Sequence, residues 1–139
     1  MPMYEEAEQA EIAISAITRE SAGAEISTRE QAVAELLRKA AFRVGQPGAW
    51  TQHYLGRFAD GTGTYVRKAL KTEEVHSHCM LGALYCEYDR DPAPDIHAAY
   101  DAIVRTIGTG LIADWNDSPL RTQDEVVGAL IRAAELAEA

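Results

Sequence analysis

The chain has 139 residues and a formal net charge of −9, and hydrophobic residues make up 47% of it. This length suits one domain with one hydrophobic core, and no apolar run approaches the roughly 20 residues that a membrane-spanning helix needs. A groove that binds nucleic acid needs clustered Lys and Arg side chains to neutralise the phosphates. This chain has 13 Lys and Arg residues but 22 Asp and Glu residues, so we expect no direct nucleic-acid binding. The acidic N-terminus lacks the apolar core of a secretion signal, so we expect a cytoplasmic protein.

Residues 1–26 are predicted to form an N-terminal acidic extension, and residues 27–139 a single globular domain. The first 30 residues hold seven acids and two bases, a net charge of −5. This charge either keeps the protein soluble or marks an arm that docks on a basic partner. Apolar spacing permits a helix over residues 5–19, whereas Ile12 and Ile14 also fit a short strand. These isoleucines are too apolar for a solvated arm, so we expect residues 1–26 to hold a homodimer.

The first well-marked helix is predicted to begin at Ser27, because Ser27 and Glu30 match the S-x-x-E capping box. Residues 21–23, Ser-Ala-Gly, are expected to break the helical pattern before it. The turn of residues 45–48 ends the helix. Its apolar stripe recurs with helical period and consists of Val33, Leu36, Leu37, Ala40, Ala41 and Val44.

A strand, turn, strand pattern follows in residues 50–66. Residues 50–58 are rich in aromatic and β-branched side chains, and Asp60 with Gly61 supplies the positive φ of a tight turn. The sequence therefore predicts one small β-hairpin.

A buried helix is predicted over residues 79–88, with its start at Thr72 or at Ser77. Gly82 inside a helix costs about 1 kcal/mol relative to alanine. We therefore expect another element to pack closely against Gly82.

Caps mark two further helices. Asp95 opens a helix that Gly108 ends, and residues 111–115 are expected to form an extended connector. Thr122 and Glu125 match a second capping box, which opens the last helix. The predicted fold is α+β and mostly α-helical, with four to five helices and one small β-hairpin.

Cys79 is the first candidate for a catalytic group. If its helix starts near Ser77, the helix dipole lowers the pKa of the thiol, and His78 is placed to take its proton. Alternatively, a cysteine in an apolar run is a small buried hydrophobe, and adjacent residues of a helix do not face each other; we favour this second interpretation. Seven residues separate Cys79 from Cys86, about 10 Å along a helix, so both are expected to be free thiols.

A weak metal candidate combines His76, His78 and Cys79 with His53 or His97 as a further ligand. Their spacing matches none of the standard zinc patterns. We expect no metal and no other cofactor.

Two short motifs beside tryptophans are candidates for ligand binding. Asn and Asp side chains orient ligands or a catalytic imidazole, but they also bond backbone N–H groups and hold turns. A tryptophan is equally a core anchor or a ligand platform. Arg121 is expected to pair with Asp117 or with the preceding loop. We favour the structural role for these candidates, which are Trp50, Gln52, Trp115, Asn116, Asp117 and Arg121.

Four motifs in residues 27–139 together resemble a family of small bacterial and phage proteins known only as a domain of unknown function. They are W-T-Q at residues 50–52, C-x-L-G-A-L at 79–84, W-N-D at 115–117 and R-T-x-x-E-V at 121–126. This chain has His53 where the family usually has glycine. The resemblance implies a helical fold with one hairpin, leaves residues 1–26 outside, and implies no activity.

We expect a non-enzymatic accessory or interaction protein, encoded by a phage or plasmid, that contacts a protein partner in a bacterial or infected host cell. The alternative is a small enzyme or ligand-binding domain that uses Cys79 with His78, Asn116 and Asp117. A further alternative is an acidic phage inhibitor of a host nucleic-acid-binding system. Motifs clustered around one cleft favour the enzyme, and motifs dispersed through the core favour the interaction protein.

Overall fold

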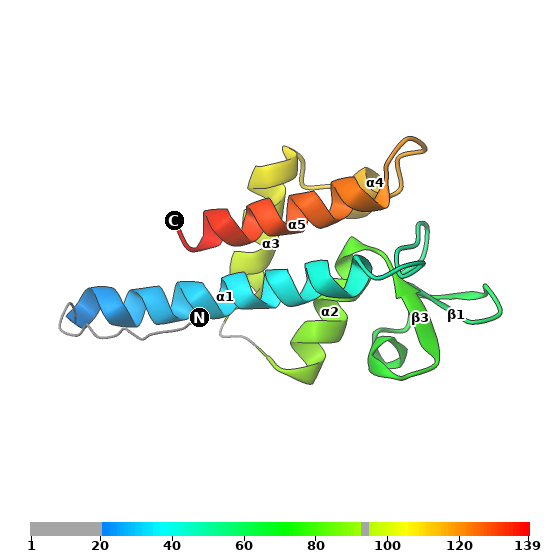
Figure 1. Cartoon of the computed structure of the whole chain (residues 1–139), viewed down its shortest axis with the longest axis horizontal. Coiled ribbons are helices and arrows are strands. Elements are labelled where there is room, and N and C mark those ends of the chain that lie inside the picture. Colours follow the sequence, from blue (N-terminus) through cyan, green and yellow to red (C-terminus); the bar gives the residue numbers. More distant parts are fainter. Residues whose placement is uncertain (1–20, 93–94) are drawn as a thin grey trace. The chain divides into compact units, whose positions relative to one another are not determined.

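The computed structural model describes residues 21–92 and 95–139, with side chains from residue 28 onward. The chain divides into two compact units, Met1–Gln31 and Ala32–Ala139, and the packing described below belongs to the second. The described elements are α1 (Ser21–Val44), β1 (Gly56–Phe58), β2 (Gly63–Thr64), the 3-10 helix η2 (Arg67–Lys71), β3 (Val75–His78), α2 (Met80–Arg90), α3 (Ile96–Ile107), α4 (Ile112–Asn116) and α5 (Gln123–Ala137). Five α-helices and one small antiparallel sheet confirm the predicted α+β class (Figure 1).

The start of α1 corrects the sequence analysis. Ser27 was expected to cap the helix, but the helix already includes Ser21 and continues through Gly23 to Val44. Serine and glycine inside a helix cost at most about 1 kcal/mol each, and the propagating backbone hydrogen bonds of a long helix absorb that cost. The helix or strand expected over residues 5–19 lies outside the described residues.

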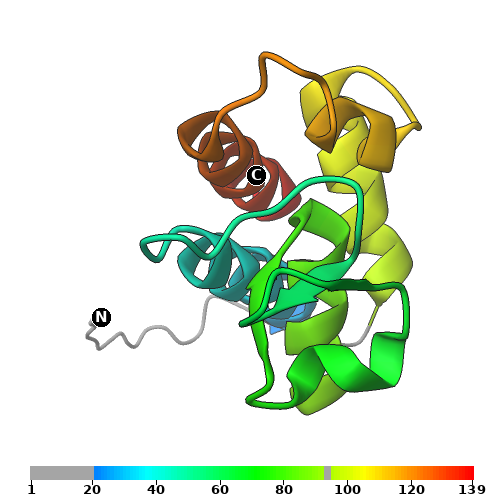
Figure 2. The same ribbon diagram turned by 90° about the vertical axis from the view of Figure 1, so that its right-hand side faces the viewer.

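The main core lies among α1, α2, α3 and α5. Residues 32–44 of α1 run antiparallel to α5, since Arg38 pairs with Glu138 while the carbonyl of Val44 accepts from Gln123. Figure 2 looks nearly along these two helices, with the sheet nearest the viewer. Alanines let the helices approach closely, and Leu37, Met80, Leu84, Ile103 and Leu130 fill the remaining space. None of the helices in the described ranges has the length and apolarity to cross a bilayer.

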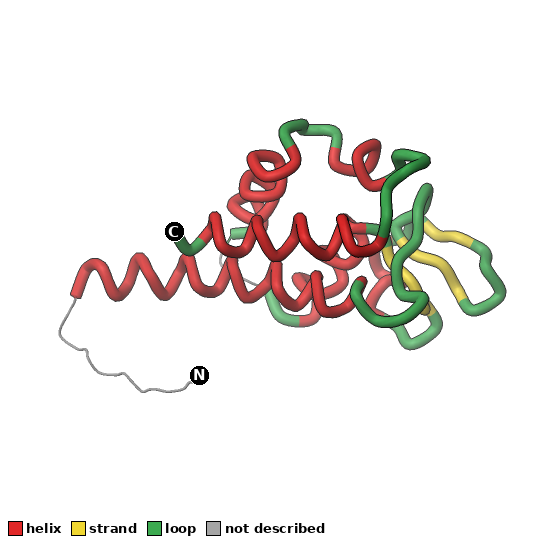
Figure 3. Tube along the Cα trace, turned by 45° about the horizontal axis from the view of Figure 1, so that its top comes forward, coloured by secondary structure: helices red, strands yellow, loops and turns green. Residues whose placement is uncertain are grey.

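The sheet has the strand order β2-β1-β3, and all pairs are antiparallel (Figure 3). Strands β1 and β2 confirm the predicted hairpin, in shorter form than expected. Strand β3 was not predicted, because residues 75–78 were assigned to the start of a helix. They instead pair with β1, where Ser77 lies opposite Arg57, and the helix begins after Cys79.

Gly82 confirms the predicted close approach. A Cβ atom at this position would lie 1.9 Å from the backbone oxygen of Leu55, in the loop before β1. The missing side chain therefore lets the first turn of α2 rest directly on the backbone of that loop.

The caps of α3 and α5 agree with the sequence analysis. The side chain of Asp95 accepts from the N–H groups of His97 and Ala98, and Gly108 ends α3 with a φ of 81°. Thr122 and Glu125 form the complete reciprocal capping box of α5. The expected extended connector is instead the short helix α4, whose Ile112 and Asn116 are one turn apart and both buried.

Candidate functional site

Asn116 is the centre of the region where three of the motifs meet. Its side chain is fully buried, and its amide oxygen accepts from Trp50 Nε1 at 2.8 Å and from the Met80 N–H at 3.1 Å. Its amide nitrogen donates to the Thr51 carbonyl at 3.1 Å and to Asp117 Oδ1 at 2.9 Å. An amide is both donor and acceptor, so this one side chain joins α4, the W-T-Q loop and the start of α2.

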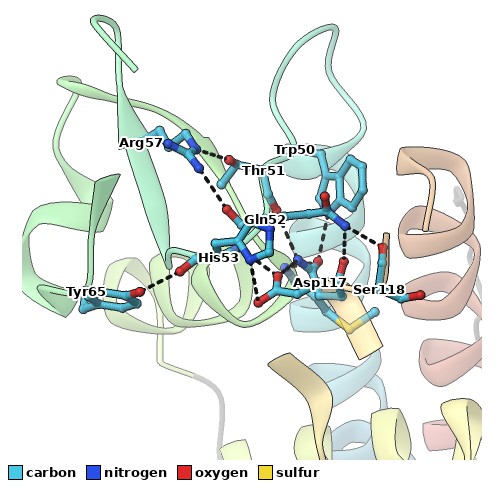
Figure 4. Close-up of polar contacts among 10 residues, drawn as sticks. Trp50, Thr51, Gln52, His53, Arg57, Tyr65, Asp117 and Ser118 are labelled. Carbon is cyan, nitrogen blue, oxygen red and sulfur yellow. Dashed lines mark hydrogen bonds and ion pairs between the residues drawn. The ribbon is translucent and has the colours of Figure 1, made fainter. Parts of the chain in front are cut away.

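Gln52, in the same loop, binds the end of this helix. Its Nε2 donates to the carbonyl of Asn116 at 3.0 Å and to that of Ser118 at 2.9 Å. The Asn116 carbonyl is the last of α4, where helices leave such groups without internal partners, and Ser118 follows the C-cap residue Asp117. Figure 4 shows Gln52 reaching from its loop toward Asp117 and Ser118. Gln52 therefore acts as a cap for α4.

His53 occupies a backbone conformation that favours glycine. Its φ is 75°, in the left-handed region, so this chain forms the turn with a histidine in it. The His53 N–H donates to Asp117 Oδ1 at 2.9 Å, and the His53 Nδ1 atom lies 3.8 Å from Asp117 Oδ2. The hydroxyl of Tyr65 donates to the His53 carbonyl at 2.7 Å.

Arg57 ties the hairpin to the W-T-Q loop. Its Nε donates to Thr51 Oγ1 at 2.6 Å, and a terminal nitrogen donates to the Gln52 carbonyl at 3.2 Å (Figure 4). The guanidinium lies 4.7 Å from the centre of the Tyr54 ring. Sequence analysis did not single out Arg57, because an arginine in a predicted strand carries no motif.

Arg121 packs on the tryptophan of the W-N-D motif. Its guanidinium lies 3.7 Å from the centre of a Trp115 ring, and its Nε donates to the Trp115 carbonyl at 2.9 Å. Arg121 also contacts Glu125 of the capping box at 3.3 Å. Arg121 was expected to pair with Asp117 or with the preceding loop, but the structure pairs it with Trp115 in α4 and Glu125 in α5.

Cys79 is the N-cap of α2. Its sulfur accepts from the Gly82 N–H at 3.3 Å, and burial raises the pKa of the thiol despite that hydrogen bond. The Asp117 carboxylate raises this pKa further. Both Cys79 and Cys86 are buried free thiols, as predicted.

The ring of His78 contacts η2. Its Nε2 lies 3.0 Å from the carbonyl of Leu70 in η2, and burial lowers the pKa of the imidazole. No hydrogen bond joins His78 to Cys79 among the described residues, so the structure does not place the two as a base and its nucleophile.

The histidines of the metal candidate lie on three parts of the chain. His76 and His78 are both on β3, where His76 is exposed and His78 is buried, whereas His53 lies in the W-T-Q loop and His97 packs against Tyr100 on α3. Within residues 21–92 and 95–139, no three His, Cys, Asp or Glu side chains are placed to hold a metal ion.

An apolar groove of about 440 Å³ lies between α1 and α5. Phe42 on its edge is 73% exposed, and Ile131 is 40% exposed. One feature of the sequence could have indicated this exposed surface: Phe42 is a large apolar residue that does not belong to the apolar stripe by which α1 packs against the core. The groove is lined by Arg38, Ala41, Phe42, Gly45, Gln46, Val127 and Ile131.

The chain was compared with family models, curated proteins and solved structures. No curated protein and no solved structure matches it significantly. A family model described as a family of unknown function, DUF6197, matches residues 28–136. Because this match covers most of the chain, including all four motifs, the protein belongs to the DUF6197 family.

Proposed function

We propose that this protein acts by protein–protein contact and not by catalysis, and that its groove receives an apolar segment of a second copy of the chain. The observation that carries the proposal is the exposure of Phe42 and Ile131 beside an apolar groove. Large apolar side chains gathered on a surface are typical of interaction sites. Aromatic side chains also contribute strongly to the free energy of binding at such sites.

The chemistry of the motifs supports contact over catalysis. Three motifs do converge, but they line a junction in which Asn116 is fully buried and bonded through both polar atoms of its side chain. The pKa of the Cys79 thiol is raised, so its reactive thiolate is disfavoured at neutral pH. A catalytic site needs a nucleophile or base that is free to meet a substrate.

The occupant we propose is residues 5–19 of the second copy. This segment has 15 residues, and a helix of that length is about 22 Å long, long enough to cover the groove, whose lining residues fall within residues 38–46 and 127–131. Ile14 and Ile17 supply apolar side chains for the groove.

Light scattering on the full chain tests this contact. We expect the parent protein to be a dimer and the Phe42→Glu variant to be a monomer, because a carboxylate is costly to bury in an apolar contact. The matched control is Leu120→Glu, since Leu120 is 87% exposed and lies outside the groove; this variant should remain a dimer. Ile14→Asp with Ile17→Asp should also give a monomer.

Two results would contradict the proposal. A parent protein that stays monomeric at all concentrations excludes the second copy as the occupant. A Phe42→Glu variant that dimerises like the parent excludes the groove.

We further propose that the protein works in the cytoplasm of a bacterium or of a phage-infected cell. Its two cysteines are free thiols, which are typical of a reducing compartment. Fractionation of the native host with an antibody against the full chain tests the location.

A further inference from the structure

A second hollow, of about 240 Å³, adjoins the groove of the proposed function. The groove and the second hollow share Phe42 and Gln46, and the Nε2 atom of Gln46 donates to the carbonyl of Phe42 at 2.9 Å. These two residues therefore form a ridge near the end of α1, with the groove on one side and the second hollow on the other. All residues that line either one belong to the unit Ala32–Ala139.

The second hollow combines buried apolar residues with a closed ion pair. Ala49 and Val75 line it, and both are buried. Arg43 and Glu87 line it as well, but each already has the other as its partner. A charged side chain that entered this hollow would lose its hydration without gaining a free partner of opposite charge, so an apolar side chain fits it better.

Phe42 presents more surface than a single contact in the groove covers. Its side chain is 73% exposed, and it lines both the groove and the second hollow. The free energy gained by burying a ring rises with the apolar area that is removed from water. A segment that fills only the groove leaves the other side of the ring in water, whereas two apolar side chains, one on each side, cover both.

The proposed occupant carries two isoleucines at the spacing that such a contact needs. On a helix, residues three apart lie on one face with about 5 to 6 Å between their Cβ atoms. Carbon atoms in contact are about 3.5 to 4 Å apart, so two side chains that flank a ring are roughly 7 to 8 Å apart where they touch it. Ile14 and Ile17, whose branches extend beyond Cβ, span this distance, whereas Ile12 falls on another face of the same helix.

We infer that residues 5–19 of the second copy straddle Phe42, with one of Ile14 and Ile17 in the groove and the other in the second hollow. This inference rests on the proposed function. It adds the second hollow to the contact surface and makes Ile14 and Ile17 the residues that determine which segment binds.

Sedimentation equilibrium on the full chain tests the second hollow. His76 is exposed on β3 and lines the second hollow but not the groove. His76→Glu adds a carboxylate there and should weaken the dimer about tenfold or more. His76→Leu extends the apolar lining and should dimerise at least as tightly as the parent. Leu120→Glu adds the same charge outside both sites and should stay within about twofold of the parent.

Alanine variants of the isoleucines test the segment in the same way. Ile14→Ala and Ile17→Ala should each weaken the dimer about tenfold or more, because each removes an apolar contact with the ring. Ile12→Ala is the matched control in the same segment, and it should stay within about twofold of the parent.

The outcomes separate this inference from the proposed function. A parent dimer that Phe42→Glu dissociates but His76→Glu leaves intact would overturn the inference and leave the proposed function standing. The same holds if Ile12→Ala weakens the dimer as much as Ile14→Ala and Ile17→Ala do, or if either of the latter two has no effect. A monomeric parent, or a Phe42→Glu variant that dimerises like the parent, would overturn the proposed function and this inference with it.

Discussion

The Asn116 junction and the groove beside Phe42 differ in how their side chains are satisfied. At the junction, polar side chains of the types found in catalytic sites are buried and form hydrogen bonds with one another and with the backbone. At the groove, the large aromatic side chain of Phe42, which belongs to none of the four motifs, is exposed to solvent. A recognisable polar motif can therefore be the means by which loops and helices are joined. The surface open to a partner can lie where the sequence has no motif.

Removal of the Asn116 amide should have the largest effect. Asn116→Leu leaves the Trp50 and Met80 N–H groups and the Thr51 carbonyl buried without this partner, so we expect a loss of about 3 to 5 kcal/mol in the free energy of unfolding. Urea unfolding measures it. Asp114→Ala, at an exposed position of the same helix, should change stability by less than about 0.5 kcal/mol. A loss below 1 kcal/mol for Asn116→Leu, on the scale of a single ordinary hydrogen bond, would mean that the junction is not what holds α4.

The second test concerns the backbone contact beside the junction. Gly82→Ala should destabilise by about 3 kcal/mol, because its Cβ meets the Leu55 backbone oxygen and one of the two must move. Gly128→Ala on α5 is the matched control, since its nearest atom belongs to the flexible Arg132 side chain. That change should stabilise by up to about 1 kcal/mol. Equal thermal melting shifts for both variants would count against the close contact.

The structure leads us to expect different stability effects at the two predicted capping boxes. Thr122→Ala should cost about 1 kcal/mol, because Thr122 caps α5. Ser27→Ala should be neutral or slightly stabilising, because residue 27 lies within helical backbone, where alanine has the better propensity. Paired urea melts check the difference, and an equal loss in both variants would contradict the long α1.

The last prediction is that a thiol reagent labels Cys79 of the native protein only slowly. Cys79 is buried with a raised pKa, so little thiolate forms at neutral pH and labelling of the native protein should be slow. The rate should increase as the pH rises. A thiol-specific chromogenic reagent measures it, with Cys86→Ser as the background for Cys79 alone. Fast labelling at neutral pH that Cys79→Ser abolishes would revive a nucleophilic role and weaken the contrast between junction and groove.

Local sequence signals predicted the elements that local forces form. The cores of α1, α2, α3 and α5 follow from apolar residues at helical spacing, and Asp95 and Thr122 mark two helix starts. The Asp60–Gly61 turn predicted the hairpin. In each case, the residues that decide the structure lie within one or two turns of each other.

Elements that depend on distant partners were missed or misassigned. Strand β3 exists because residues 75–78 pair with residues 56–58, about 20 positions away. Helix α4 has only five residues, too few for a periodic pattern, and it is held by Gln52, more than 60 residues earlier.

The sequence by itself determined which residues are unusual: Trp50, Gln52, Asn116 and Asp117 stand out from it, and they do meet in the folded chain. Only the tertiary structure decided what they do. The partners of the Asn116 amide come from segments up to 66 residues apart, and whether a polar atom is satisfied depends on such partners. For the same reason, only the packed helices reveal that Phe42 is exposed while Ala41 beside it is buried.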